Sequence, residues 1–198
     1  MASIDYPHQP EIAGYLDFFR LAAGMKDTLR SGLTAAGRPE SAAEHSWRLA
    51  LMALTLEDRL PEIDFDRLIR LLLIHDLAEV LTGDTPAPEQ AGDKRGVERA
   101  AMAELLRPLP AAVAARLGAL WDEYAAAETP EARLAKGLDR IETVLHHVEG
   151  ANPPGFDYGF NLGYGRAHTD SHPMLAALRA PIDAETTRRA EAMLGKPD

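Results

Sequence analysis

The chain contains no cysteine, so disulfide bonds and thiolate metal sites are excluded. This absence also fits a reducing compartment, where disulfides are rare. Apolar runs such as the one over residues 71–74 fall far short of the roughly 20 residues that a membrane-spanning helix needs. The first residues, MASIDYPHQPEIAGY, hold an early acid and no positively charged stretch ahead of an apolar one. We therefore expect no signal peptide and a cytoplasmic protein.

Basic residues are in deficit, since 21 Lys and Arg stand against 31 Asp and Glu, for a formal net charge of −10. This charge argues against a nucleic-acid partner, because binding to a duplex depends on basic groups that neutralise phosphates. It does not argue against a small anionic substrate, because a bound dication and a few arginines can reverse the field within a pocket. The length of 198 residues suits one domain with a sizeable core.

Strand-like runs with alternating β-branched residues are missing, and Ala, Leu, Glu and Arg dominate, so we predict an all-α, single-domain, compact helical fold. A capping box, Ser41-Ala-Ala-Glu44, marks one helix start. We expect a core over about residues 11–150, then a loop and a C-terminal helical appendage at 151–198. The expected helices cover 11–29, 41–56, 64–81, 93–106, 110–127, 130–149 and 184–194, with loops at 31–39 and 152–165.

The sharpest chemical feature is His75-Asp76 with Glu79, inside the leucine-rich helix that we expect to be the central buried one. At about 100° per residue, Glu79 lies about 40° from His75 and between it and Asp76. Three ionisable groups then share one sector of a dry helix, and buried charges are costly unless they are paired or bound to a metal. The pattern favours a functional site. The alternative is a buried ion-pair network with Arg67 or Arg70.

Two further residues could complete a metal site. His45 falls on the inward face of the helix that begins at Ser41, although a single histidine is weak support for a site. Asp139 lies about 100° from Leu138, at the edge of an apolar stripe, and periodicity alone favours solvent exposure for it. The remaining histidine pairs lack a carboxylate pattern and are interpreted as structural or solvated: His146 and His147, and His168 and His172.

The order His45, then His75-Asp76, then Asp139 resembles the four-ligand signature H…HD…D of the HD superfamily of phosphohydrolases. The segments RPESAAEH at 38–45, IHDLAEVLTGD at 74–84 and ARLAKGLD at 132–139 are similar to the branch that contains 5′-deoxynucleotidases. H…HD…D alone is a loose signal, whereas HDxxExxxGD preceded by RPES…EH is a specific one.

The resemblance assigns roles by position. The family's metal ligands correspond to His45, His75, Asp76 and Asp139. Glu79 and Asp84 match an acidic pair beside the metal, assigned to catalysis or to a second metal site. Arg30 matches an arginine that contacts the substrate phosphate, and Arg38 is a further candidate for the phosphate oxygens. Leu33 stands where family members commonly carry a tryptophan, which puts contacts to the base or sugar in question. No role is transferred to residues 155–165.

Two imidazoles and two carboxylates suit Mn²⁺, Co²⁺, Fe²⁺, Ni²⁺ or Zn²⁺, with Mg²⁺ a candidate for a second site. The resemblance implies an enzyme of nucleotide metabolism, a metal-dependent phosphohydrolase that cleaves deoxyribonucleoside 5′-monophosphates to nucleoside and phosphate. It also implies a homodimer, with a small-molecule nucleotide as substrate and neither nucleic acid nor membrane as partner. Alternatives are another nucleotide substrate (a triphosphate, an alarmone or a cyclic nucleotide), a non-catalytic HD regulatory module and, more distantly, a di-iron oxygenase.

Overall fold

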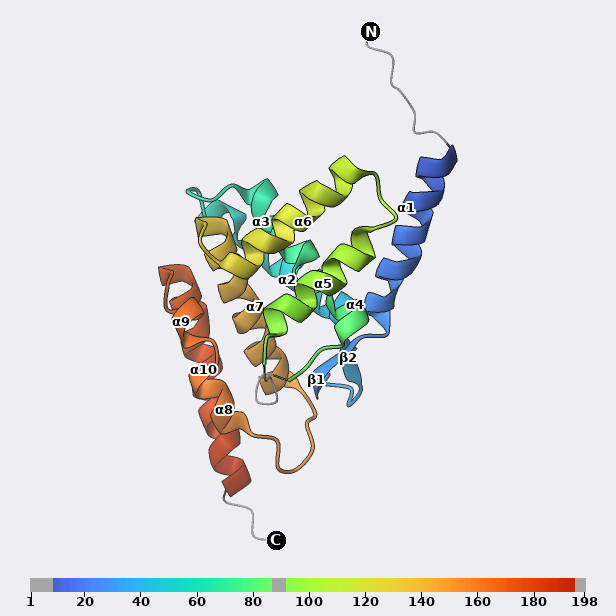
Figure 1. Cartoon of the computed structure of the whole chain (residues 1–198). Helices are drawn as coiled ribbons and strands as arrows, with labels where there is room; N and C mark the ends of the chain where they lie inside the picture. The colour runs from blue at the N-terminus through green and yellow to red at the C-terminus, as the bar shows by residue number, and fades with distance from the viewer. Residues whose placement is uncertain (1–8, 87–91, 195–198) are drawn as a thin grey trace.

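The structure, a computed structural model, describes residues 9–86 and 92–194, which form helices and one short pair of strands (Figure 1). The elements in chain order are α1 (Gln9–Ala22), the 3₁₀ helix η1 (Ala23–Lys26), β1 (Leu29–Leu33), β2 (Pro39–Ser41), α2 (Ala42–Leu56), the 3₁₀ helix η2 (Glu57–Arg59), α3 (Phe65–Ile74), α4 (Glu79–Thr82), α5 (Lys94–Leu106), α6 (Ala111–Ala126), α7 (Pro130–Glu149), α8 (Tyr158–Gly163), α9 (Arg166–Thr169) and α10 (Pro173–Leu194). The all-α prediction is confirmed. Within the described ranges, no helix combines the length and apolar character needed to cross a membrane.

The central buried helix is α7, not the helix that carries His75. Thirteen of the 20 residues of α7 are buried, against four of ten in α3. Leu49 of α2, Leu71 of α3 and Leu175 of α10 are fully buried in the same cluster as Leu138 of α7. Figure 1 shows α7 in the middle of the molecule with α10 along one side. Because α7 is covered on most sides, its polar residues are buried together with its leucines.

The start of α2 follows the predicted capping box. Ser41 Oγ accepts a hydrogen bond from the N–H of Glu44 at 3.3 Å, and the Glu44 carboxylate accepts one from the N–H of Ser41 at 2.9 Å. This reciprocal cap satisfies two backbone donors and sets the first residue of the helix. With the start set there, His45 and Leu49 fall on the buried face.

The loop expected over residues 31–39 is shorter, because only residues 34–38 form a turn and the rest belongs to two strands. β1 and β2 pair as an antiparallel hairpin, with Leu29 opposite Ser41 and Leu33 opposite Pro39. Gly32 adopts a φ of +84°, and a Cβ there would lie 2.7 Å from the ring of His147. Only glycine allows both the backbone conformation and this close approach. The sequence prediction missed the hairpin because its two glycines and its proline read as turn residues.

The helix expected over 64–81 is interrupted. Asp64 caps α3, but α3 ends at Ile74, and α4 begins only at Glu79. Between them, backbone bonds span three residues, from Leu77 N–H to Ile74 and from Glu79 N–H to Asp76. The His75 ring lies 2.7 Å from the Leu72 carbonyl, the acceptor that a continuing helix would use for a backbone amide. His75 and Asp76 therefore lie at a helix end rather than in mid-helix.

Two predicted helix ends are also corrected. The first helix stops at Ala22 and tightens into η1, where Gly24 lies so close to Val80 that a Cβ would be 2.7 Å from it. The last helix begins at Pro173 rather than near 184. It continues through Pro181 because its apolar residues on both sides pack against the core. The expected division into a core and an appendage stays a prediction.

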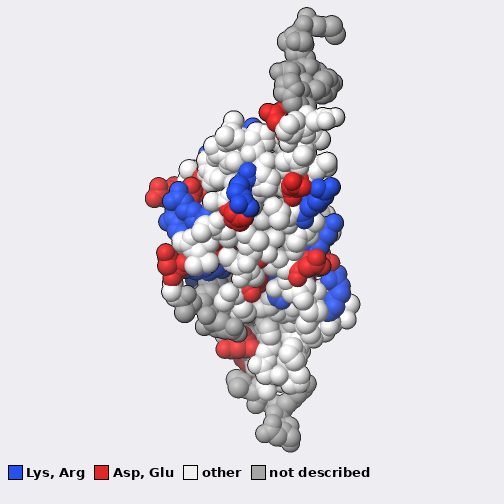
Figure 2. All heavy atoms as spheres, turned by 45° about the vertical axis from the view of Figure 1, so that its right-hand side comes forward, with Lys and Arg blue, Asp and Glu red and all other residues white. Residues whose placement is uncertain are grey.

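The apolar face of α1 is left uncovered in the single chain. α1 buries none of its residues, and Ile12, Leu16 and Phe19 expose 45%, 46% and 58% of their surface. In Figure 2 the molecule is turned so that the side with α1 faces forward. Uncharged atoms lie there between scattered charged groups.

Candidate metal centre and active site

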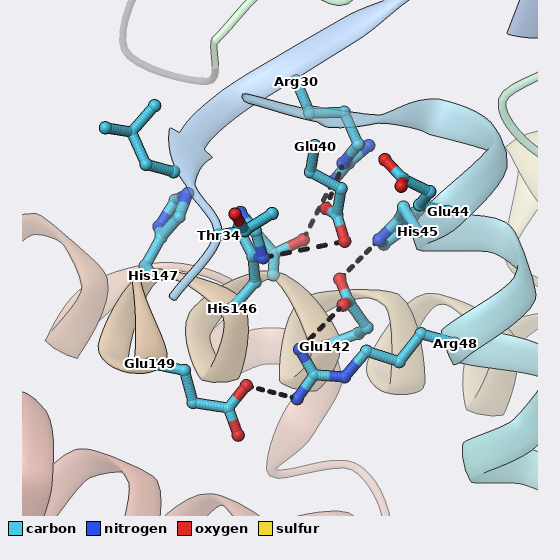
Figure 3. Close-up of polar contacts among 12 residues, drawn as sticks. Arg30, Thr34, Glu40, Glu44, His45, Arg48, Glu142, His146, His147 and Glu149 are labelled. Carbon is cyan, nitrogen blue, oxygen red and sulfur yellow. Dashed lines mark hydrogen bonds and ion pairs between the residues drawn. The ribbon is translucent and has the colours of Figure 1, made fainter. Parts of the chain in front are cut away.

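Two histidine rings meet in the interior, one from α2 and one from the end of α3, with the centroids of His45 and His75 5.4 Å apart. His75 Nδ1 lies 2.7 Å from the carbonyl oxygen of Leu72, and His45 Nδ1 contacts the Glu142 carboxylate (Figure 3). Because these oxygens accept hydrogen bonds, each Nδ1 carries a proton, which leaves each Nε2 as the ring atom that can bind a metal. Both Nε2 atoms are buried, and neither has a hydrogen-bond partner within the described residues.

Two carboxylates lie at these free nitrogens. Asp76 Oδ2 is 2.9 Å from His75 Nε2 and 3.8 Å from His45 Nε2. Asp139 Oδ1 is 3.3 Å from His45 Nε2. Periodicity favoured an exposed Asp139, but only 4% of its surface is exposed, because α7 is central. The structure thus brings together all four residues that the sequence pattern selected.

A divalent metal fits this donor set. Buried polar atoms without partners cost about 1–3 kcal/mol each, so two such nitrogens close together call for an ion or a water. Two imidazole nitrogens with two carboxylate oxygens, and no sulfur, suit a borderline divalent transition metal. His45, His75 and Asp76 each offer a ligand atom within 4.8 Å of the others.

Neighbouring charges outweigh burial in setting the pKa values of Asp76 and His45. Burial raises the pKa of Asp76, but His75 and Arg30 outweigh it and hold that pKa below its usual range. Burial lowers the pKa of His45, as does Arg30, yet Glu142 and Asp139 overcome both and raise it to about 10. In the metal-free protein His45 therefore holds a proton at neutral pH, which a metal has to displace.

Arg30, from β1, also contacts this group of candidate metal ligands. Its guanidinium donates to Asp76 Oδ2 at 2.9 Å and to Thr143 Oγ1 at 3.1 Å. The buried network with Arg67 or Arg70 does not form, because each of these arginines pairs with an acidic residue on the outside of the molecule. The hairpin that the sequence prediction missed is therefore the element that positions Arg30.

Glu79, the first residue of α4, stands beside this group. It is 5% exposed, and its Oε2 has no hydrogen-bond partner in the part of the chain that the structure describes. Lys94 Nζ is 4.0 Å from Oε1. Burial raises the pKa of Glu79 to about 9, and the carboxylates of Asp76 and Asp84 add to the rise while Arg30 and Lys94 oppose it. Such a carboxyl group can hold or release a proton near neutral pH.

A cavity of about 550 Å³ opens over these residues. Its volume lies in the range of small-molecule sites. His45 lies beneath it, and the site residues among its lining are Arg30, His75, Asp76, Glu79, Asp84 and Asp139. The candidate metal position is therefore reachable by a ligand.

The far part of the cavity is built by residues 156–164, to which the sequence assigned no role. Phe156, Phe160 and Tyr164 line it together with Asn161 and His147. Phe160 and Tyr164 lie with ring centroids 5.5 Å apart, and Phe156 meets His147 edge-on at 5.0 Å. His147, interpreted from sequence as structural or solvated, thus lies in the cavity wall.

Two residues singled out from sequence lie elsewhere. Arg38 is exposed, and both ends of its guanidinium bond the Glu44 carboxylate, at 2.5 and 3.0 Å, so the structure does not bring it to the cavity. Leu33 does not line the cavity either, and its backbone N–H donates to Asn152 Oδ1 at 2.7 Å. The Glu44 carboxylate, which also caps α2, thus holds the Arg38 guanidinium.

Sequence reasoning also missed two residues that touch the candidate ligands. Tyr124 of α6 donates from its hydroxyl to Asp139 Oδ2 at 2.8 Å. Glu142 contacts His45 and lies one helical turn after Asp139. This i, i+3 spacing places two acids on neighbouring positions of one helix and could have marked Glu142. Nothing in the sequence connects Tyr124 to the site.

Comparisons with known proteins agree with this geometry. The sequence profile described as HD domain matches residues 22–179, which is most of the chain. The chain belongs to the HD domain family. All six predicted metal-binding and acidic residues lie inside the matched range.

Individual proteins are similar to this one over two thirds of the chain or more. 5′-Deoxynucleotidase HDDC2 of Homo sapiens is 32% identical over 191 residues, 92% of this chain and 91% of that protein. The Xenopus laevis protein of the same name is 38% identical over 138 residues, 68% of each chain. The crystal structure of a "Predicted metal-dependent phosphohydrolase" from Magnetospirillum magnetotacticum MS-1 superposes with a TM-score of 0.77 at 34% identity, covering 92% of this chain and 98% of that one. The HD-domain fold expected from the sequence is confirmed.

Proposed function

We propose that the protein is a divalent-metal-dependent phosphohydrolase that cleaves the phosphomonoester of deoxyribonucleoside 5′-monophosphates. The observation that carries the proposal is the pair of buried, unpartnered Nε2 atoms of His45 and His75, with Asp76 and Asp139 beside them under a cavity. The 5′-deoxynucleotidase relatives, similar over most of the chain, support the substrate class.

His45, His75, Asp76 and Asp139 are the residues that we propose hold the metal. A metal bound there would lower the pKa of a bound water and neutralise charge on the phosphoryl group. The donor set favours Mn²⁺, Co²⁺, Fe²⁺, Ni²⁺ or Zn²⁺, and Mg²⁺ remains a candidate for a second site with Asp84.

Arg30 is the residue that we propose binds the phosphate oxygens. Its guanidinium lies in the cavity wall and is held from two sides, by Asp76 and Thr143, so its orientation is set before a substrate arrives. A preoriented guanidinium suits phosphate, because its parallel N–H groups match two phosphate oxygens. Arg38 has no part in this proposal.

Glu79 is the proposed proton acceptor and donor. Burial raises its pKa to about 9 in the metal-free protein, and a dication bound nearby would lower that pKa toward neutrality, where the unbonded Oε2 can accept a proton. Accepting the proton of the attacking water and returning one to the leaving 5′ oxygen is typically worth about 10²–10⁴-fold in rate. Asp84 lines the cavity near it and either supplies the second proton or binds a second metal.

The aromatic end of the cavity is the proposed place for the nucleoside. Asp139, Thr143 and His147 all line the cavity and follow one another at intervals of four residues along α7. At 1.5 Å per residue they span about 12 Å, which leads from the proposed metal to Phe156 and Phe160. Aromatic side chains bind bases by stacking, at about 1–3 kcal/mol per base.

We also propose the finer properties that the resemblance implies: a role in nucleotide metabolism, a cytoplasmic location and a homodimeric state. The uncovered apolar face of α1 supports the dimer, because such faces are rare on monomers. Light scattering should give twice the chain mass of 21.6 kDa. The mass of a single chain would contradict the dimer.

The test of the function is phosphate release from a panel of 5′-deoxynucleotides and ribonucleotides. Metal-stripped protein receives Mn²⁺, Co²⁺ or Mg²⁺, and Asp76→Ala serves as the blank. We expect wild type alone to release phosphate from deoxyribonucleoside monophosphates. No release across the panel by protein with metal bound would overturn the assignment and point to another nucleotide or to a regulatory role.

A further inference from the structure

One proposed metal ligand is held by a second buried carboxylate. The His45 ring reaches Glu142 through Nδ1, and both side chains have no exposed surface (Figure 3). The other histidine, His75, is held at the same ring atom by a backbone carbonyl, which carries no net charge. The two rings thus have matching orientations but different supports, one ionic and one neutral.

Glu142 is in turn held by α2. Arg48, three residues after His45, places Nη1 3.6 Å from Glu142 Oε1 and Nη2 2.6 Å from Glu149 (Figure 3). Two residues of α2, His45 and Arg48, therefore face the two oxygens of one carboxylate of α7. A carboxylate held in this way has little freedom to rotate, and neither has the ring that it bonds.

The same region contains a second group with metal-like composition, Glu40, Glu142 and His146, whose donor atoms lie within 4.8 Å of one another. The unbonded oxygens of its two carboxylates already face arginines: Glu40 Oε2 lies 3.7 Å from Arg30, and Glu142 Oε1 lies 3.6 Å from Arg48. Unlike His75, Asp76 and Asp139, none of these three residues lines the cavity. The group is therefore better explained as support for His45 than as a site of its own.

We propose that Glu142 is a positioning residue that orients His45 Nε2 toward the metal and strengthens it as a ligand. The inference rests on the metal of the proposed function. The negative charge on the far side of the ring makes His45 a better donor than His75, since outer carboxylates raise the basicity of the histidines they bond.

The test compares metal binding by three variants, independent of turnover. Glu142→Gln keeps the shape and an acceptor oxygen but removes the charge, and Glu142→Asp keeps the charge but withdraws it by one methylene. Glu149→Gln is the matched control, because Glu149 also bonds Arg48 but does not touch His45. Affinity for Co²⁺ is measured by chelator competition, together with the visible spectrum of bound Co²⁺ and the thermal unfolding of the metal-free proteins.

We expect Glu142→Gln to weaken Co²⁺ binding by about 10- to 100-fold and to shift the Co²⁺ spectrum. Glu142→Asp should fall between it and wild type, and Glu149→Gln should match wild type. Wild-type affinity and spectrum in Glu142→Gln would overturn the inference, even if metal-free stability falls. If Glu142→Gln does not fold, wild-type affinity in Glu142→Asp would overturn it. If wild type does not bind Co²⁺ at all, the proposed function is overturned as well. This result differs from the failure of the Glu142 inference alone, in which wild type still binds Co²⁺.

Discussion

Two groups of histidine and acidic side chains lie close together in this molecule, and they differ in whether the cavity reaches them. The first group is His45, His75, Asp76 and Asp139, and the second is Glu40, Glu142 and His146. In the first, both Nε2 atoms are without partners and three of the four residues line the cavity. In the second, His146 Nε2 is also without a partner, but no member lines the cavity.

The difference shows that ligand-type residues alone do not make a metal site. Close donor atoms and a buried histidine nitrogen without a partner are common to both groups, but only the first group opens to the cavity. The comparison assigns binding to the first group and support to the second.

The largest expected effect is the loss of a shared ligand. Asp76 approaches both histidines, so Asp76→Ala should lose the metal and lower phosphate release by about 10⁴-fold, since metal-ion catalysis supplies several kcal/mol. His146→Ala, the matched change in the second group, should keep its metal. Metal content by mass spectrometry and phosphate release on the same samples check both. Loss of metal from His146→Ala with retention in Asp76→Ala would reverse the comparison.

Glu79→Gln separates proton transfer from metal binding beside the first group. The amide cannot exchange a proton, so turnover should fall by about 10²–10⁴-fold while metal content stays at the wild-type level. Steady-state kinetics with parallel metal analysis measure this. If the variant instead loses its metal, Glu79 is a ligand, and the proton transfer belongs to another residue.

Phe160→Ala tests the aromatic end of the cavity. Loss of a stacking ring should raise KM for deoxyribonucleoside monophosphates by about 5- to 150-fold, from about 1–3 kcal/mol per base. Deoxyribose 5-phosphate, which has no base, is the control substrate and should be cleaved equally by both proteins. An equal loss on both substrates would show that Phe160 supports the fold rather than the base.

The pH dependence of metal binding should distinguish the two groups of side chains. The pKa of His45 in the metal-free protein is raised to about 10, so metal binding below that pH displaces one proton. Affinity should therefore rise about tenfold per pH unit between pH 6 and 8. In the second group, burial lowers the pKa of His146 to about 4, while burial and Glu142 raise that of Glu40 to about 7, so metal affinity there would level off above pH 7. Competition titrations at several pH values measure the slope, and a flat profile would contradict the protonated His45.

The smallest effect is expected for Arg38→Ala. Arg38 is exposed and its guanidinium bonds the Glu44 carboxylate. It contacts none of the proposed metal ligands. Its removal should leave kcat and KM within about twofold of wild type, as expected for a surface pair. Steady-state kinetics check this, and a large rise in KM would return Arg38 to the phosphate site.

The sequence predicted which four residues the fold brings together better than it predicted the backbone that carries them. His45 followed from a capping box that sets the phase of α2, a local signal that tertiary packing does not override. Asp139 did not follow from periodicity, because the burial of α7 on most of its faces appears only when the other helices are in place. The family resemblance, rather than the helix pattern, selected it.

The rest of the site depends on contacts distant in sequence. The helix break after Ile74 was hidden in a leucine run, since nothing local signals that the His75 ring takes the Leu72 carbonyl. The hairpin that positions Arg30 is too short to show an alternating pattern. Residues 156–164 read as a loop because their role is to pack against α7 and α10, which no local pattern encodes.

The most direct test of the central claim is X-ray absorption spectroscopy of the protein loaded with one equivalent of Zn²⁺ or Co²⁺, alongside His146→Ala. The first group supplies two imidazoles and the second only one. The account predicts two imidazole nitrogens together with oxygen ligands, and the same spectrum from His146→Ala. A shell with a single imidazole, lost in His146→Ala, would place the metal in the second group and contradict the account.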